Sequence, residues 1–198
     1  MPRMSPKLGP RFESAIRFAL RVHGHDTRKG KPTPYVAHLL GVCSLVLQHG
    51  GSEDEAIGAL LHDTLEDHPE VVTPSILRRR FGSRVLTIVE GCTDTPPGFK
   101  GGQKPAWRVR KQAYVAHLAV APRSVRVVAL ADKLYNLLEL NADLRAHGKA
   151  TLNRFNAGPS DQSWYFSAVL RALRAVGDDG PMLDSFDRAV REFRRLIR

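Results

Sequence analysis

Apolar residues recur along most of the chain at the three- and four-residue spacing of amphipathic helices. Residues 12–22 show the pattern first, and it predicts further helices over 35–48, 52–67, 73–81, 106–120, 122–147, 162–176 and 181–197. Residues 83–91 are rich in β-branched side chains, which suit a helix or a buried strand, and we expect a helix. No pair of strands joined by a hairpin turn is evident, so the sequence predicts an all-α, multi-helix fold.

Turn-forming residues separate these helices. Ser52 is followed three residues later by Glu55, a capping box that begins a helix expected to continue through Asp67. Loops rich in glycine, proline and polar residues are expected over 23–34, 93–105 and 148–160. We expect a single domain over residues 1–198, with its core at about 12–175 and a C-terminal helix at about 181–197.

Composition narrows the classes of partner. The chain has 198 residues, 42% of them hydrophobic, and a net charge of +10, which favours an anionic partner such as nucleic acid, an acidic lipid surface or a polyphosphorylated small molecule. It shows neither a membrane-length apolar run nor a secretory signal, so we expect a cytoplasmic protein with no membrane partner. Cys43 and Cys92 are expected to be reduced core thiols. Nothing in the sequence indicates an oligomeric state.

The segment GALLHDTLED, residues 58–67, places four polar groups at the end of an apolar helix. Residues four apart share a helix face, so His62 should lie beside Glu66, and Asp63 beside Asp67. Burying such groups without partners costs several kcal/mol each, on the order of 2–7. A divalent cation would remove much of that cost by supplying the missing positive charge.

Two further residues complete a metal-binding set. His38 lies among apolar residues in PYVAH, and Asp132 lies inside VRVVALADKLYNLL. Taken alone, His38 is more often a core histidine, and Asp132 a cap or an ion-pair partner of Lys133. Together with His62 and Asp63, they form a two-His, two-Asp set that suits Mn²⁺, Fe²⁺ or Zn²⁺.

The remaining polar residues of the segment have a chemical use beside a metal. Glu66 and Asp67 are carboxylates placed to orient or deprotonate a water molecule there. A second His-Asp dipeptide, His25-Asp26, lies in a Gly/Lys-rich loop with no Glu-Asp pair after it. We therefore interpret His25-Asp26 as ordinary loop.

Basic residues are frequent on the loops that flank these motifs. Each one alone is more often a solvated surface charge, but as a group around a metal site they would attract an anionic substrate. Among them we predict Lys104 and Arg108 as phosphate contacts. The group comprises Arg28, Lys29, Lys100, Lys104, Arg108 and Lys111.

The motifs together resemble a known family. His38, His62-Asp63 and Asp132 match the pattern of the HD phosphohydrolase superfamily. The segments RKGKPTPYVAH, ALLHDTLED, FGSRV and LADKLYNL are similar to the hydrolase domain of the RelA/SpoT family, and most of all to its stand-alone small alarmone hydrolases. The resemblance covers about residues 12–175.

This resemblance implies an all-helical HD-domain enzyme that depends on Mn²⁺ or another divalent ion. Such enzymes remove the 3′-pyrophosphate from ppGpp or pppGpp, giving GDP or GTP, and so degrade the alarmone of the stringent response. It implies that the metal ligands are His38, His62, Asp63 and Asp132, and that Glu66 and Asp67 handle the water. The implied nucleotide contacts are Arg28, Lys29, Asn136 and Tyr165.

Two other functions stay open at this point, as does a biological role compatible with the enzyme, the protection of a cell from a toxic alarmone synthetase. An HD enzyme with the same metal site could act on ppApp or on the substrate of a nucleotidase or phosphodiesterase. The basic pI of about 10.1 also suggests a nonenzymatic nucleic-acid binder. The chain has no recognition-helix motif, zinc finger or regular aromatic–basic interleaving, so we do not expect nucleic acid as the partner.

Overall fold

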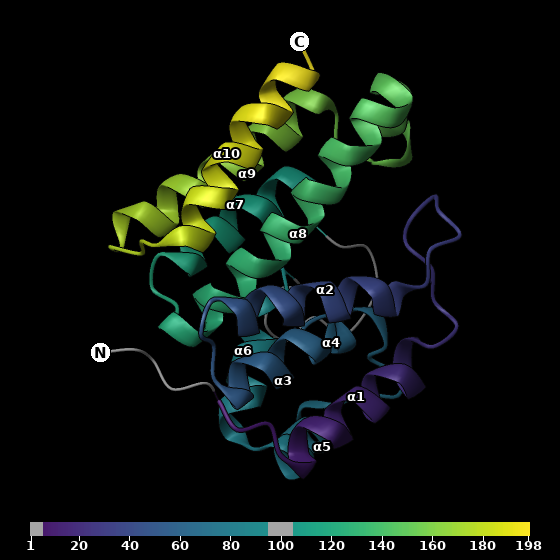
Figure 1. The fold of residues 1–198 in the computed structure, drawn as a ribbon, viewed down its shortest axis with the longest axis vertical. Helices are drawn as coiled ribbons and strands as arrows, with labels where there is room; N and C mark the ends of the chain where they lie inside the picture. The colour runs from purple at the N-terminus through teal and green to yellow at the C-terminus, as the bar shows by residue number, and fades with distance from the viewer. Residues whose placement is uncertain (1–5, 95–104) are drawn as a thin grey trace. The chain divides into compact units, whose positions relative to one another are not determined.

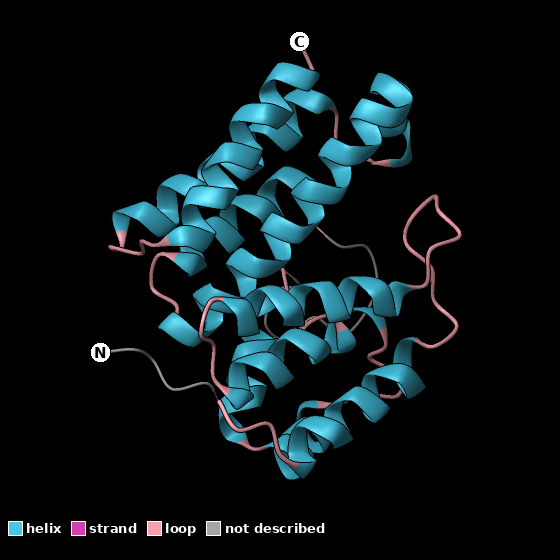
Figure 2. Cartoon of the chain, in the orientation of Figure 1, coloured by secondary structure: helices cyan, strands magenta, loops and turns pink. Residues whose placement is uncertain are grey.

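The structure is a computed structural model that describes residues 6–94 and 105–198. These residues form ten α-helices, one 3₁₀ helix and no strand (Figures 1 and 2). Their one isolated bridge joins Thr27 to Pro34 within a loop. The all-α fold predicted from the sequence is confirmed.

The helices follow the predicted segments closely. Residues 83–91, for which a strand was the alternative, lie in a helix. In chain order the elements are α1 (Pro10–His23), α2 (Tyr35–Gln48), α3 (Glu53–Leu61), α4 (Thr64–Asp67), α5 (Pro74–Phe81), α6 (Ser83–Cys92), α7 (Trp107–Leu118), α8 (Arg123–His147), η1 (Gly148–Arg154), α9 (Pro159–Ala175) and α10 (Pro181–Leu196).

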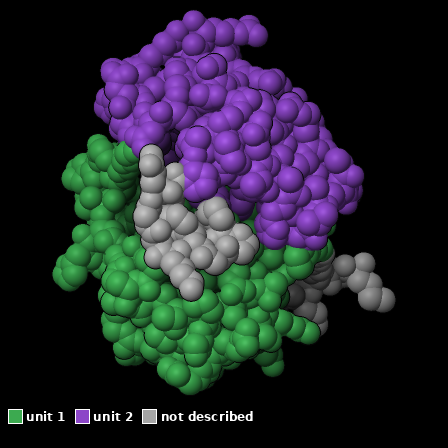
Figure 3. Space-filling view, turned by 180° about the vertical axis from the view of Figure 1, so that it is seen from behind, with its two compact units in different colours: residues 1–93, 122–135 green, residues 94–121, 136–198 purple. Residues whose placement is uncertain are grey.

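The chain divides into two compact units (Figure 3). The first comprises residues 1–93 and 122–135, and the second comprises residues 94–121 and 136–198. Helix α8 therefore contributes its first half to one unit and its second half to the other. The single domain expected from the sequence stays a prediction.

Helix α3 forms much of the core of the first unit. Its capping box is present, because the Ser52 hydroxyl accepts from the Glu55 amide and the Glu55 carboxylate accepts from the Ser52 amide. The helix is buried from Glu55 to Leu61 and packs against α1, α2 and α6. Gly58 makes the α6 contact close, since a Cβ there would meet Cγ2 of Ile88 at 2.5 Å.

Two local differences from the prediction concern helix ends. The helix expected over 52–67 is interrupted at His62 and Asp63, which form a turn between α3 and α4. Asp63 becomes the N-cap of α4, where its carbonyl accepts from the amides of Glu66 and Asp67. The loop expected over 148–160 begins with the 3₁₀ helix η1.

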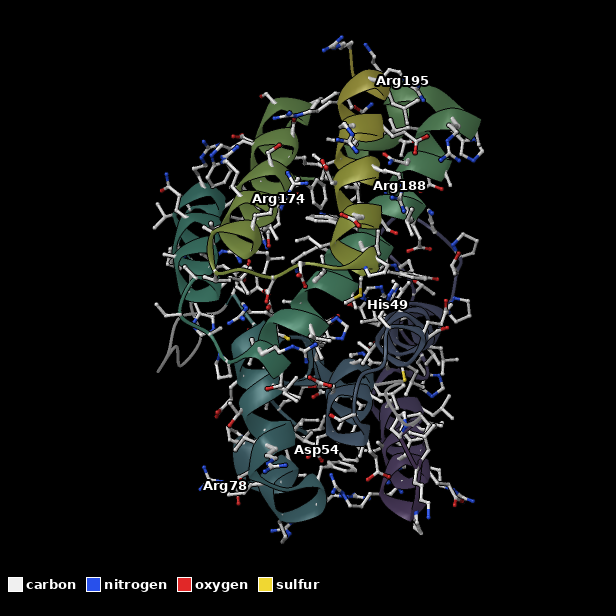
Figure 4. All side chains as sticks on the ribbon, turned by 60° about the vertical axis from the view of Figure 1, so that its left-hand side comes forward. His49, Asp54, Arg78, Arg174, Arg188 and Arg195 are labelled. Carbon is white, nitrogen blue, oxygen red and sulfur yellow. The ribbon has the colours of Figure 1, made fainter. Side chains whose placement is uncertain are left out.

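Charged side chains lie on the surface of both units. In the second unit, Arg174 of α9 pairs with Asp187 of α10 at 2.7 Å, and Arg188 and Arg195 also project from α10 (Figure 4). In the first unit, Arg11 pairs with Asp54. Among the residues described, no helix combines the length and the apolar character needed to span a bilayer.

Candidate metal centre

Three elements of the first unit bring two imidazoles and a carboxylate together. His38 comes from α2, His62 from the turn after α3, and Asp132 from α8. Nε2 of His38 lies 3.3 Å from Nε2 of His62 and 3.3 Å from Oδ1 of Asp132. Nε2 of His62 lies 3.6 Å from the same oxygen. These three donor atoms surround one point and are spaced as ligands of a single ion would be.

The local fold explains why His62 points its Nε2 inward. His62 directly follows α3, and its Nδ1 lies 2.9 Å from the carbonyl oxygen of Ala59. A nitrogen facing a carbonyl must carry the proton, so a neutral His62 keeps its lone pair on Nε2. Histidines that bind metals are oriented in this way by a backbone acceptor. His62 is buried, with 2% of the residue exposed.

Asp63 lies at the edge of the same group. Its Oδ2 is 2.9 Å from Nε2 of His62 and 3.7 Å from Nε2 of His38. The hydroxyl of Tyr35 donates to that oxygen at 2.5 Å. Tyr35 was not among the residues predicted from the sequence, although its position three residues before His38 in α2 places it on the same face.

The buried imidazoles and carboxylates of the group shift one another's pKa values. Burial opposes a charged imidazole at His62, but the Asp63 carboxylate and hydrogen bonds to both aspartates raise the pKa of His62 well above its usual value. Burial likewise works against the Asp132 carboxylate, yet Lys133 and the two histidines lower its pKa. Burial lowers the pKa of His38. The group therefore holds an extra proton on His62, which a divalent cation would replace.

Glu66 and Asp67 follow on α4. The hydroxyl of Thr93 donates to Glu66 at 3.1 Å. Partial burial of the carboxyl, together with the neighbouring charges of Asp63 and Glu66, raises the pKa of Asp67 to about 7. A carboxylate with this pKa can exchange a proton near neutral pH.

The first predicted substrate contacts lie in the loop between α1 and α2. The guanidinium carbon of Arg28 is 5.5 Å from the ring centre of Tyr35, so Arg28 is linked to the residue that contacts Asp63. Lys29 is exposed. The backbone of Arg28 is fixed by a hydrogen bond from its amide to the carbonyl of Thr33.

Other predicted substrate residues belong to the second unit. Arg108 lies 3.4 Å over the ring centre of Trp164 and pairs with Asp161 at 2.7 Å. Tyr165 is buried, and its ring is 5.9 Å from that of Trp107. Asn136 follows Asp132 by four residues in α8, at the start of this unit's share of the helix. Lys104 lies outside the described residues.

One expectation about the loop was wrong. Asp26 is not an ordinary loop residue, because its Oδ2 contacts His23 at 2.8 Å and His68 at 2.7 Å. The reason is a partner 42 residues away, which a local sequence pattern cannot reveal. His25 is exposed, as the interpretation of the loop implied.

Comparisons with known proteins agree with this geometry. Residues 15–155 match the HD domain family. The chain is 37% identical over 131 residues, 64% of its length and 67% of the relative's, to guanosine-3′,5′-bis(diphosphate) 3′-pyrophosphohydrolase MESH1 of Xenopus tropicalis. It is 34% identical over 135 residues to guanosine-3′,5′-bis(diphosphate) 3′-pyrophosphohydrolase of Aquifex aeolicus, covering 68% of this chain and 18% of that one. A solved structure, described as a metazoan ortholog of SpoT that hydrolyzes ppGpp, superimposes with a TM-score of 0.72 and 25% identity, covering 92% and 95% of the two chains.

Proposed function

The chain belongs to the HD domain family, and on that premise we propose that it is a divalent-metal-dependent hydrolase that removes the 3′-pyrophosphate from ppGpp. The products are GDP and pyrophosphate, or GTP and pyrophosphate when the substrate is pppGpp. The observation that carries the proposal is the group formed by His38, His62 and Asp132, present in a chain whose relatives carry that activity in their names.

Four side chains of this chain would hold the ion. His38, His62 and Asp132 offer three converging donors, and the Asp63 carboxylate lies beside both imidazoles. Two imidazoles with two carboxylates suit Mn²⁺, and Mn²⁺ is the ion we propose. When bound, a divalent ion stabilises negative charge on phosphoryl oxygens and makes water easier to deprotonate.

Glu66 and Asp67 are proposed to manage the water that attacks phosphorus. Asp67 has a pKa of about 7, so near neutral pH a large share of the protein holds it as an unprotonated base. The hydroxyl of Thr93 donates to one oxygen of Glu66, and the carboxylate can also accept a hydrogen bond from the water. Asp67 would take the proton and Glu66 would orient the water.

The substrate is densely anionic, and Arg28 and Lys29 are proposed to contact it. Both lie on the loop that leads into α2, and Arg28 lies over Tyr35, whose hydroxyl contacts Asp63. For Asn136, Arg108 and Tyr165 the roles implied by the resemblance stay predictions, as does a cytoplasmic location. The base contacts also leave ppApp as an alternative substrate.

The test is turnover of a nucleotide panel by purified protein with Mn²⁺. We expect ppGpp to yield GDP and pyrophosphate, resolved by anion exchange, with no turnover in EDTA or in the Asp63→Ala variant. Faster turnover of ppApp than of ppGpp would move the assignment to the adenine alarmone. A protein that binds metal but turns over neither nucleotide would contradict the proposal.

A further inference from the structure

A second group of metal-binding side chains lies in the first unit, apart from the residues discussed above as ligands. It consists of His23 at the end of α1, Asp26 in the following loop, and His68 directly after α4. Nδ1 of His23 is 2.8 Å from Oδ2 of Asp26, and Nε2 of His68 is 2.7 Å from the same oxygen. Two segments of the chain, 42 residues apart between Asp26 and His68, therefore aim two imidazole nitrogens at one carboxylate.

The two rings are held in position by further contacts. The ring of His23 is fully buried and stacks on Tyr35 with centres 5.1 Å apart. Nδ1 of His68 lies 3.2 Å from a carboxylate oxygen of Glu70. With its Nδ1 proton donated to Glu70, His68 can give up the Nε2 proton that it shares with Asp26 and still be a neutral imidazole. A carboxylate behind a histidine is the arrangement that orients and strengthens imidazole ligands of metals.

The donors need only a small rearrangement to accept an ion. Ligands of a tetrahedral Zn²⁺ ion, with bonds of about 2.0 Å, lie roughly 3.3 Å apart. The donors here are closer because hydrogen bonds join them directly. Asp26 lies in a loop and His68 directly follows a helix of four residues, and a change of about half an ångström at these two side chains would give the spacing of ligands.

Partial exposure of the Asp26 and His68 side chains lets an ion enter and lets water act as a fourth ligand. The side chains of Asp26 and His68 are 34% and 21% exposed, while that of His23 is fully buried. Solvent therefore reaches the group from the side of Asp26 and His68, and water can complete a four-coordinate shell. Binding would release the Nε2 proton of His68 and move the proton of His23 from Nδ1, which now faces Asp26, to its own Nε2, so that both rings coordinate as neutral imidazoles.

We propose that His23, Asp26 and His68 form a second binding site for a divalent transition-metal ion of the Zn²⁺ type. The ion joins the loop that carries Arg28 and Lys29 to the end of α4, which carries Glu66 and Asp67. The site is independent of the alarmone activity, because its donors are not the residues proposed to hold the catalytic ion.

The test counts metal ions with Zn²⁺ as the probe. The full chain is stripped with a chelator, titrated with Zn²⁺ against a chromophoric competitor, and its content is measured by mass spectrometry after gel filtration. We expect about two equivalents in the wild type, one in Asp26→Asn and in His68→Gln, and one in His62→Gln. The matched control is His25→Gln, which changes the neighbouring exposed histidine and should keep two.

Two outcomes of the metal count would overturn the proposal. One is a wild type that binds a single equivalent, lost in His62→Gln and kept in Asp26→Asn, which would leave the second group as a hydrogen-bonded brace. The other is a second equivalent that survives both Asp26→Asn and His68→Gln. Circular dichroism confirms folding of each variant.

In the His62→Gln background Zn²⁺ should slow tryptic cleavage after Arg28 and Lys29, and unchanged cleavage would also count against the site.

Discussion

The hydroxyl of Tyr35 donates a 2.5 Å hydrogen bond to Oδ2 of Asp63, the oxygen that also faces His62 and His38. Burial and the Asp63 charge raise the pKa of Tyr35, so the phenol stays a donor at all physiological pH values. Tyr35 therefore fixes the orientation of a carboxylate proposed to hold the metal. Tyr35 hydrogen-bonds to a proposed ligand, and substitution of residues in such positions commonly changes the affinity for the metal.

Replacing Tyr35 tests this relationship. In Tyr35→Phe the Asp63 carboxylate loses its donor, and we expect Mn²⁺ affinity to fall by roughly 10-fold or more, with the ring contacts kept. Isothermal titration measures the change. The matched control is Tyr135→Phe, since the Tyr135 ring also packs against His38 and its hydroxyl contacts the Ala37 carbonyl at 3.5 Å. Equal affinities in the two variants would contradict the proposed role of Tyr35.

Asp67 predicts a pH dependence of stability in the metal-free protein. Its pKa is about 7 in the folded chain against 3.8 for an ordinary aspartate, so the folded state binds the proton more tightly. This contribution to stability is present below about pH 4 and is lost as the pH rises through 7. Asp67→Asn should therefore gain stability relative to wild type between pH 5 and pH 8.

Urea unfolding of wild type and Asp67→Asn at pH 5 and pH 8, with EDTA present, measures this difference in stability. Parallel pH dependence in wild type and Asp67→Asn would show that the carboxyl of Asp67 titrates normally. The same variant should lose most of its ppGpp turnover with Mn²⁺ present, because an amide cannot take up a proton.

Gly41 provides a packing prediction beside the metal centre. A Cβ at this position in α2 would meet the Cε2 atom of Tyr135 at 2.0 Å. Gly41→Ala should therefore destabilise the protein by about 1–3 kcal/mol, although alanine favours the helix by up to about 1 kcal/mol. In a Tyr135→Ser background the same substitution should be neutral or stabilising. A double-mutant cycle by chemical denaturation that shows no coupling would contradict this packing.

The capping box of α3 predicts a change in stability. Ser52→Ala removes the acceptor for the Glu55 amide and should cost about 1 kcal/mol. The control is Ser44→Ala, whose hydroxyl makes an exposed contact with Gln48 in α2 and should change stability by a few tenths of a kcal/mol at most. Equal unfolding midpoints for the two variants would show that the box does not hold α3.

Much of this fold could be predicted because its helices have strong local signals. The bounds of α2 match the apolar segment at 35–48, and the capping box marks the start of α3. The turn at His62 and Asp63 was missed because both residues keep helical dihedral angles, φ −58° and ψ −31° for His62 and φ −95° and ψ −8° for Asp63. The side-chain pattern continues through them although the helix is interrupted.

The parts that escaped prediction depend on distant partners. Tyr35 acts on Asp63 from 28 residues away, and Asp26 meets His68 across 42 residues. The division into two units could not be predicted from the sequence, because the boundary between residues 135 and 136 lies inside the uninterrupted helix α8. The convergence of His38, His62 and Asp132 was anticipated because each carried a polar group on an otherwise apolar helix.

The most direct measurement compares metal content and ppGpp turnover in His62→Gln with those in His25→Gln. His62 presents a buried Nε2 to the proposed ion, whereas His25 is exposed in the loop after α1. We predict that His62→Gln loses both the catalytic Mn²⁺ and the release of pyrophosphate, and that His25→Gln keeps both. Turnover of ppGpp at the wild-type rate by a folded His62→Gln protein would contradict the assignment of the activity to this centre.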